Sequence, residues 1–135
     1  MSAAIRVAAT AIADMVAHAR EAAPAECCGL LAGRGGAVVE AVRTRNIAED
    51  PKRFLIDPAD HITRRRDARQ RGLDIVGFYH SHVFAAAAPS ARDRDEAAYP
   101  DHLFAIVGLA SDPPEIRLFR LIDGNFLEVP FVTVA

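Results

Sequence analysis

The most constraining feature of this chain is a near-continuous apolar run at residues 74–79, which ends in His80-Ser81-His82. A run of this length without alternation is typical of a central β-strand that is covered on both faces. Helices must therefore pack on both sides of the sheet that holds it. The chain has 135 residues, so we expect a single domain over residues 1–135 and exclude an eight-stranded α/β barrel.

Helix signals occur at three places. Apolar residues at the spacing i, i+3, i+4 and i+7 predict a helix that Thr10 caps and Pro24 ends. The pair Asp57-Pro58 predicts a second helix, because aspartate is a good cap and proline fits the first helical position. Ser90 predicts the cap of a short third helix that runs to about residue 99.

Strand signals are short apolar runs bounded by turn residues. The expected strands are residues 27–32, 37–43, 54–56, 74–79, 103–109, 115–122 and 126–134. Asp123-Gly124 predicts a tight hairpin between the last two. The order of elements indicates the α/β class, with one central mixed β-sheet and helices packed on it.

Charge and cysteine content narrow the class of protein. Sixteen Lys and Arg residues against eighteen Asp and Glu residues leave a net charge of -2, so nucleic acid and anionic membranes are not expected as main partners. No apolar stretch is long enough to span a bilayer. Cys27 and Cys28 are adjacent, which excludes a disulfide framework or a four-cysteine zinc site within the chain and favours a cytoplasmic location.

His80 and His82 lie two residues apart, so in an extended segment their side chains leave the same face and can bind one metal ion. Asp93 follows in the helix that Ser90 caps, and its carboxylate can complete a set of three protein ligands. A fourth tetrahedral position is then open to water, which is typical of catalytic zinc. The sequence therefore predicts one Zn²⁺ ion per chain in a hydrolytic site.

Two segments resemble motifs of the JAMM (MPN+) metalloproteases. Residues 80–93 match the pattern H-[S/T]-H-x7-S-x2-D, and residues 24–33 match the glutamate-bearing pattern P-x-E-x-C-G-L-L-x-G. The resemblance covers most of the chain. It implies an α/β/α sandwich with a central mixed sheet, similar to cytidine deaminases, in agreement with the element order above.

The resemblance also implies roles for five residues. His80, His82 and Asp93 would bind zinc, Glu26 would activate the zinc-bound water, and Ser90 would hydrogen-bond near the developing oxyanion. The implied activity is hydrolysis of the peptide or isopeptide bond that follows the C-terminal diglycine of ubiquitin or a ubiquitin-like protein. Few residues separate Asp93 from the next strand, so the chain is most similar to the minimal prokaryotic type, whose substrates include ubiquitin-like sulfur-carrier proteins.

The family resemblance leaves two other functions open. One is a non-catalytic scaffold of the same fold, against which the intact ligand motif argues. The other is a RadC-like protein associated with DNA, against which the glutamate segment and the charge argue. A homodimer is compatible with the sequence. Val83 stands where the family usually has proline, so we expect the loop after His82 to be less rigid than in relatives.

Simpler roles are possible for several of these residues. Ser90 and Asp93 can form a capping box without any metal. Cys27 could be a nucleophile, although its histidine partner would have to come from the metal site. The arginine-rich run at residues 64–71 is typical of a solvated helix face, with Asp60 and Asp67 as local partners, and the alternative is a docking surface for an acidic ubiquitin-like protein.

Overall fold

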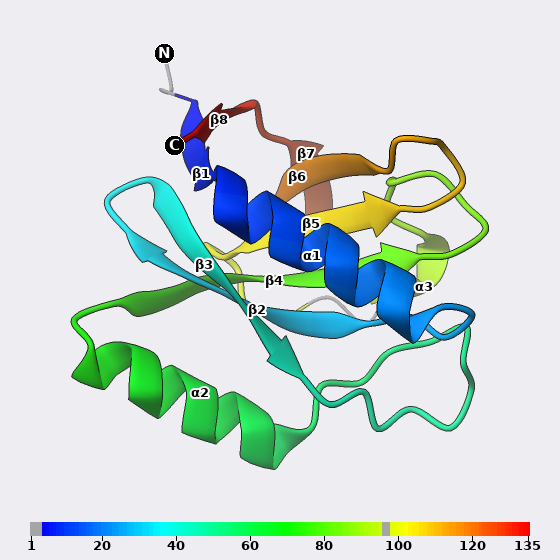
Figure 1. Cartoon of the computed structure of the whole chain (residues 1–135), viewed down its shortest axis with the longest axis horizontal. Coiled ribbons are helices and arrows are strands. Elements are labelled where there is room, and N and C mark those ends of the chain that lie inside the picture. Colours follow the sequence, from blue (N-terminus) through cyan, green and yellow to red (C-terminus); the bar gives the residue numbers. More distant parts are fainter. Residues whose placement is uncertain (1–3, 96–97) are drawn as a thin grey trace.

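The computed structural model describes residues 4–95 and 98–135, and β4, Asp74–His82, runs through its centre (Figure 1). β4 pairs with antiparallel β2, Cys28–Arg34, on one side and with parallel β5, Leu103–Gly108, on the other. The predicted central strand is confirmed. It continues beyond the predicted run through both histidines, so that the strand itself fixes their backbone.

All strands that the structure describes belong to one eight-stranded mixed sheet of order β7-β6-β5-β4-β2-β3-β1-β8. The remaining strands are β1 (Ile5–Ala8), β3 (Ala37–Thr44), β6 (Glu115–Ile122), β7 (Asn125–Glu128) and β8 (Phe131–Val134). Only Val129 and Pro130 separate β7 from β8, yet these strands form opposite edges of the sheet. The sheet must therefore curl until its two edges approach each other.

The two longer helices pack on opposite faces of the sheet. α1, Ala9–Ala22, buries Ala11, Met15 and Ala19 in the larger core cluster. α2, Pro58–Gln70, packs Ala68 against the other face, where Leu30 is fully buried. These layers confirm the predicted α/β class and α/β/α sandwich (Figure 1). None of the helices described has the length and apolar character that a bilayer crossing requires.

The predicted start of α2 is confirmed, and that of α1 is wrong. Asp57 Oδ1 accepts a hydrogen bond of 3.1 Å from the Ala59 N–H, as expected of a helix cap. Thr10 instead lies inside α1, whose N-cap is Ala8 without any side-chain cap bond. The reason is β1, which the sequence patterns did not predict: the helix continues directly from this four-residue strand, leaving no turn at which Thr10 could cap.

Two predicted strands and one predicted helix end also need correction. Residues 54–56 form no strand, and Ile56 makes only an isolated bridge to Asn46. Residues 126–134 divide into β7 and β8 because the chain passes from one sheet edge to the other at Pro130. α3 is Ala91–Asp95. Its expected continuation crosses residues 96–97, which lie outside the described residues, and Tyr99 has a φ of 67°, which no right-handed helix allows.

Candidate metal centre and active site

β4 brings two imidazole rings to one point. Side chains alternate along a strand, so His80 and His82 share the face that α2 covers while Ser81 points to the face that α1 covers. Both rings are buried, with 6% and 8% of the residue exposed. Their Nε2 atoms lie 3.2 Å apart. The structure thus places the two predicted ligands together.

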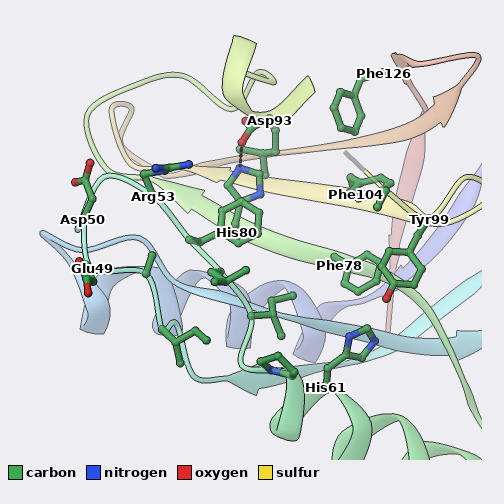
Figure 2. A pocket seen from close by; sticks show the side chains of 18 residues that line it. Glu49, Asp50, Arg53, His61, Phe78, His80, Asp93, Tyr99, Phe104 and Phe126 are labelled. Atoms are coloured by element: carbon green, nitrogen blue, oxygen red, sulfur yellow. Dashed lines mark ion pairs between the residues drawn. The ribbon is translucent and has the colours of Figure 1, made fainter. Parts of the chain in front are cut away.

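Asp93 reaches the same point from α3. Its N–H donates to Ser90 Oγ at 3.0 Å, and the Ser90 N–H donates to Asp93 Oδ2 at 2.9 Å, which confirms the predicted capping box. The carboxylate lies between the histidines: Oδ2 is 3.2 Å from His82 Nε2, and Oδ1 is 3.3 Å from His80 Nε2. Figure 2 shows Asp93 directed at the His80 ring. Capping and metal binding are therefore compatible in one side chain.

The three donor groups fit a tetrahedral zinc ion. His80 Nε2 and His82 Nε2 lie 3.2 Å apart, and they lie 3.3 and 3.2 Å from two different oxygens of Asp93. With one ligand atom taken from each residue, the three atoms all lie within 4.8 Å of one another. A tetrahedron with zinc bonds of about 2.0 Å has edges of about 3.3 Å, so one ion can reach all three groups after a rearrangement of the Asp93 carboxylate. Two imidazoles and one carboxylate form a donor set typical of catalytic zinc.

Two further contacts fix the orientation of the histidine rings. His82 Nδ1 lies 2.9 Å from the Ala86 carbonyl oxygen, which can only accept, so Nδ1 carries a proton and Nε2 is the atom that can bind a metal once it is deprotonated. The ring of Phe54 stacks on His80 with centroids 4.3 Å apart. The loop after β4 is anchored by Ala86 and by the fully buried Ala87. Greater mobility of this loop because of Val83 stays a prediction.

Glu26 immediately precedes Cys27 and β2, and its side chain is half-buried. Burial raises the pKa of Glu26 to about 7; the negative charge of Asp93 adds to this shift and His82 opposes it. The carboxyl group is therefore close enough to two of the candidate ligands to interact electrostatically with them. A group that titrates near neutrality is well suited to accept and return a proton.

The candidate ligands have a different electrostatic balance. Burial works against ionisation of Asp93, but hydrogen bonds from His80 and His82 outweigh it and hold its pKa well below the usual range. The hydrogen bond to Asp93 raises the pKa of His82, whereas burial lowers the pKa of His80. Asp93 is consequently an ionised ligand across the physiological pH range.

A cavity of about 860 Å³ adjoins the cluster, with His80 and Asp93 in its wall (Figure 2). Aromatic rings, among them Phe78, Tyr99 and Phe104, form one side of it. The loop between β3 and α2 forms another side, through residues 47–50 and 53–56. A largely apolar space of this size lies within the range of ligand-binding pockets.

Glu26 lines a second cavity, of about 380 Å³. Ala48 and Glu49 border both cavities, so the loop between β3 and α2 is the partition between them. One side of this loop faces the apolar cavity, and the other side faces Glu26.

Sequence patterns did not single out Asn46 or Phe54, which both contact the site. Phe54 was assigned to a strand on its apolar neighbours, and only the fold shows its ring against His80. Asn46 had a usable signal, since asparagine between a strand and an irregular segment commonly hydrogen-bonds neighbouring backbone groups. Its partner at Glu26 lies twenty residues away, and no local pattern encodes that distance.

The alternative role for Cys27 as a nucleophile is wrong. Cys27 and Cys28 are both buried and free. Burial raises the pKa of each thiol to about 11, so neither forms the thiolate that attack requires.

The arginine-rich run is only partly paired. Arg71 binds Glu40 at 2.9 Å and Asp67 at 3.1 Å, which confirms Asp67 as a local partner. Asp60 instead accepts from the Arg45 N–H at 2.8 Å. A docking role for this run stays a prediction.

Residues 8–122 match the family model for prokaryotic homologs of the JAB domain. The chain belongs to this family. Its fold is therefore the JAB/MPN fold, and the chain is a hydrolytic peptidase of the JAMM type rather than a non-catalytic scaffold.

Named relatives of this JAB-family chain agree with that conclusion. It is 38% identical over 109 residues to a desampylase of Haloferax volcanii, covering 76% of this chain and 78% of the relative. It is 33% identical over 120 residues to the CysO-cysteine peptidase of Mycobacterium tuberculosis, covering 86% and 82%. The solution structure of DSY2949 from Desulfitobacterium hafniense superposes with a TM-score of 0.88 at 31% identity, covering 96% and 92%.

Proposed function

We propose that this chain is a zinc-dependent peptidase that hydrolyses the peptide or isopeptide bond after the C-terminal diglycine of a ubiquitin-like sulfur-carrier protein. The observation that carries the proposal is the cluster of His80, His82 and Asp93, whose ligand atoms all lie within 4.8 Å of one another beside an apolar cavity. The substrate class is supported by the relatives, one of which is named for CysO-cysteine. The two buried free cysteines support a cytoplasmic location.

In this mechanism His80, His82 and Asp93 would hold one zinc ion. The bound ion would supply a Lewis acid for the scissile carbonyl and would lower the pKa of a water molecule. Glu26 accepts a proton from the attacking water and returns it to the leaving amine. In the metal-free protein the pKa of Glu26 is raised to about 7, which supports a role for this group in accepting and returning a proton.

Ser90 is the second catalytic group of the proposal. Its Oγ already accepts from the Asp93 N–H at 3.0 Å. A hydroxyl group can accept and donate at the same time, so the Ser90 O–H can still donate to the oxygen on which negative charge develops. A single donor of this kind contributes about 100- to 1,000-fold to kcat in enzymes where it has been removed.

The test is incubation of the zinc-loaded protein with ubiquitin-like carriers that end in Gly-Gly and bear one further residue, joined either as a peptide or through a lysine side chain. Mass spectrometry should show release of that residue with the diglycine intact, and the preferred linkage identifies the bond type. Chelation should abolish cleavage. A protein that binds one equivalent of zinc but trims no carrier in either linkage would overturn the substrate class.

A further inference from the structure

The backbone of Glu26 is hydrogen-bonded on both sides to the loop between β3 and α2, which we call the partition loop (residues 46–56). The Glu26 N–H donates to the Pro51 carbonyl at 2.9 Å. The Glu26 carbonyl accepts from Asn46 Nδ2 at 3.0 Å. The peptide groups that position the proposed general base thus depend on a segment that lies twenty or more residues along the chain.

Asn46 also determines the conformation of the partition loop itself. Its Nδ2 donates to the Arg53 carbonyl at 3.0 Å as well as to Glu26. Its Oδ1 accepts from the Ala48 N–H at 3.0 Å and from the Leu55 N–H at 2.9 Å. Both partners of Nδ2 are acceptors and both partners of Oδ1 are donors, so the amide can have only one orientation.

The partition loop also contacts one of the candidate metal ligands. Phe54 stacks on His80, and neighbouring loop residues line the large cavity in which we place the substrate. The same loop therefore contacts the substrate cavity, one candidate ligand and, through Asn46, the backbone of Glu26.

We infer that Asn46 is a positioning residue that ties the wall of the substrate cavity to the backbone of Glu26. The inference rests on the proposed function, because it assigns Asn46 an effect on catalysis through Glu26. Asn46 does not touch the reacting atoms. It keeps Glu26 at a fixed distance from the candidate metal ligands while the partition loop holds the substrate. This matters because displacement of a catalytic group by about 1 Å can lower the rate about 100-fold.

The main variant is Asn46→Asp, since a carboxylate keeps the two acceptor contacts to Ala48 and Leu55 but cannot donate to Glu26. We expect kcat to fall by about 10- to 100-fold with little change in KM and with one equivalent of zinc retained. Asn125→Asp, at the exposed first residue of β7, is the matched control and should leave both constants unchanged. Asn46→Ala adds no charge and should show the same loss of kcat; it carries the test if Asn46→Asp does not fold.

A double-mutant cycle separates positioning from a general structural effect. Once Glu26→Gln has removed the base, Asn46→Asp should cost no further activity, because the residue acts through Glu26. A purely structural role would lower the residual activity again by the same factor. Independent, multiplicative losses in kcat would therefore overturn the inference even where the proposed function holds.

Amide hydrogen exchange of the wild-type protein tests, without any activity measurement, whether Asn46 links the partition loop to Glu26. If Asn46 joins the two segments, the Glu26 N–H should exchange through the same opening event as the Ala48 and Leu55 N–H groups, and Asn46→Ala should accelerate all three together. Exchange of Glu26 that is unaffected by the variant overturns the inference. If exchange is coupled but the protein cleaves no carrier, the link that Asn46 makes between the loop and Glu26 is confirmed and only the proposed function is rejected.

Discussion

Glu26 and Asp93 are opposite kinds of carboxyl group within one small site. Hydrogen bonds from two imidazoles hold the pKa of Asp93 below its usual range, whereas burial raises the pKa of Glu26 to about 7. One environment favours a permanent anion and the other favours a group that gains and loses a proton. This separation of pKa values supports the proposal that Asp93 binds the metal and Glu26 transfers the proton.

Glu26→Gln should leave only a small residual activity and should stabilise the metal-free protein in a pH-dependent way. The folded protein favours protonated Glu26 up to pH 7, but the unfolded chain ionises near pH 4.5. The wild-type protein therefore loses stability as pH rises from 4.5 to 7, and the variant does not. After allowance for partial exposure, we expect Glu26→Gln to be more stable by about 1–2 kcal/mol at pH 8 and equal at pH 4.

Denaturant unfolding in the presence of a chelator measures this difference. Glu115→Gln, at an exposed position of β6, is the matched control for the removal of a solvent-exposed carboxylate. Equal stability of Glu26→Gln and wild type at pH 8 would mean that burial does not perturb this carboxyl group.

Ser90→Ala should affect stability and catalysis separately. Loss of the 3.0 Å bond to the Asp93 N–H should cost about 1 kcal/mol, as for other helix caps. Loss of the donated O–H should lower kcat by about 100- to 1,000-fold. Ser90→Thr retains a hydroxyl group and should restore most of both. If Ser90→Ala unfolds more easily yet keeps its kcat, Ser90 serves only as a cap.

That the candidate ligands lie together could be predicted from the sequence because the spacings involved are local: two residues within a strand and three within a capping box. Asn46 and Phe54 could not, because each acts on a residue at least twenty positions away. Their contacts exist only after β2, β4 and the partition loop have been brought together.

At the scale of elements, Gly29 shows how tightly β2 is packed between its neighbours. A Cβ atom at this position would lie 2.2 Å from Tyr79 Cε1 and 2.4 Å from the Val42 carbonyl oxygen. Tyr79 is nearly fully buried and cannot move aside freely. A glycine at this position in the glutamate-bearing segment is therefore a packing requirement of the strand that follows Glu26.

Gly29→Ala should consequently destabilise the protein severely, by several kcal/mol, because backbone as well as ring must shift. Tyr79→Leu should not rescue it, since the carbonyl of Val42 still blocks the added methyl group. Ala32→Gly, in the same strand, is the matched control and should cost only about 1 kcal/mol. Circular dichroism during thermal unfolding compares the three; a Gly29→Ala protein as stable as wild type would contradict the packing argument.

Helices and strands could be predicted from the sequence where the residues at their ends form a recognisable local motif. Asp57-Pro58 marks the start of α2 by capping chemistry alone. β1 could not be predicted because it leads directly into α1. The apparent strand at residues 54–56 failed for a different reason: in the fold its apolar side chains line a cavity instead of pairing with a neighbouring strand.

At the scale of the whole molecule, the curling of the sheet determines with which strands the C-terminal residues pair. The pattern at residues 126–134 favours one long strand, but β7 pairs with β6 at one edge and β8 pairs with β1 at the other. The Val129 N–H still bonds to Leu118, and the Ile5 N–H bonds to Pro130. The pairing of β8 thus depends on residues such as Ile5, more than a hundred positions from Pro130. No local sequence pattern contains a contact over that distance.

The candidate ligands His80 and His82 lie on β4 in the centre of the sheet, and Asp93 lies on α3 at its surface. A zinc ion bound by all three would link these two elements, so zinc should stabilise the whole fold. We expect zinc at about 100 times its dissociation constant to add about 2.7 kcal/mol to the free energy of unfolding. Asp93→Ala should lose most of this increment. The increment should also shrink as pH falls, because His80 and His82 must be deprotonated to bind metal.

Thermal unfolding with zinc and with chelator, at pH 8 and at pH 5, measures the effect in wild type and variant. Asp123→Ala, in the exposed turn between β6 and β7, is the control, because it removes a carboxylate far along the chain from the cluster and should leave the zinc-induced rise in Tm intact. An equal rise in wild type and Asp93→Ala would place the stabilising ion elsewhere in the molecule. A rise that is unchanged at pH 5 would argue against imidazole ligands, since protons then fail to compete with the metal.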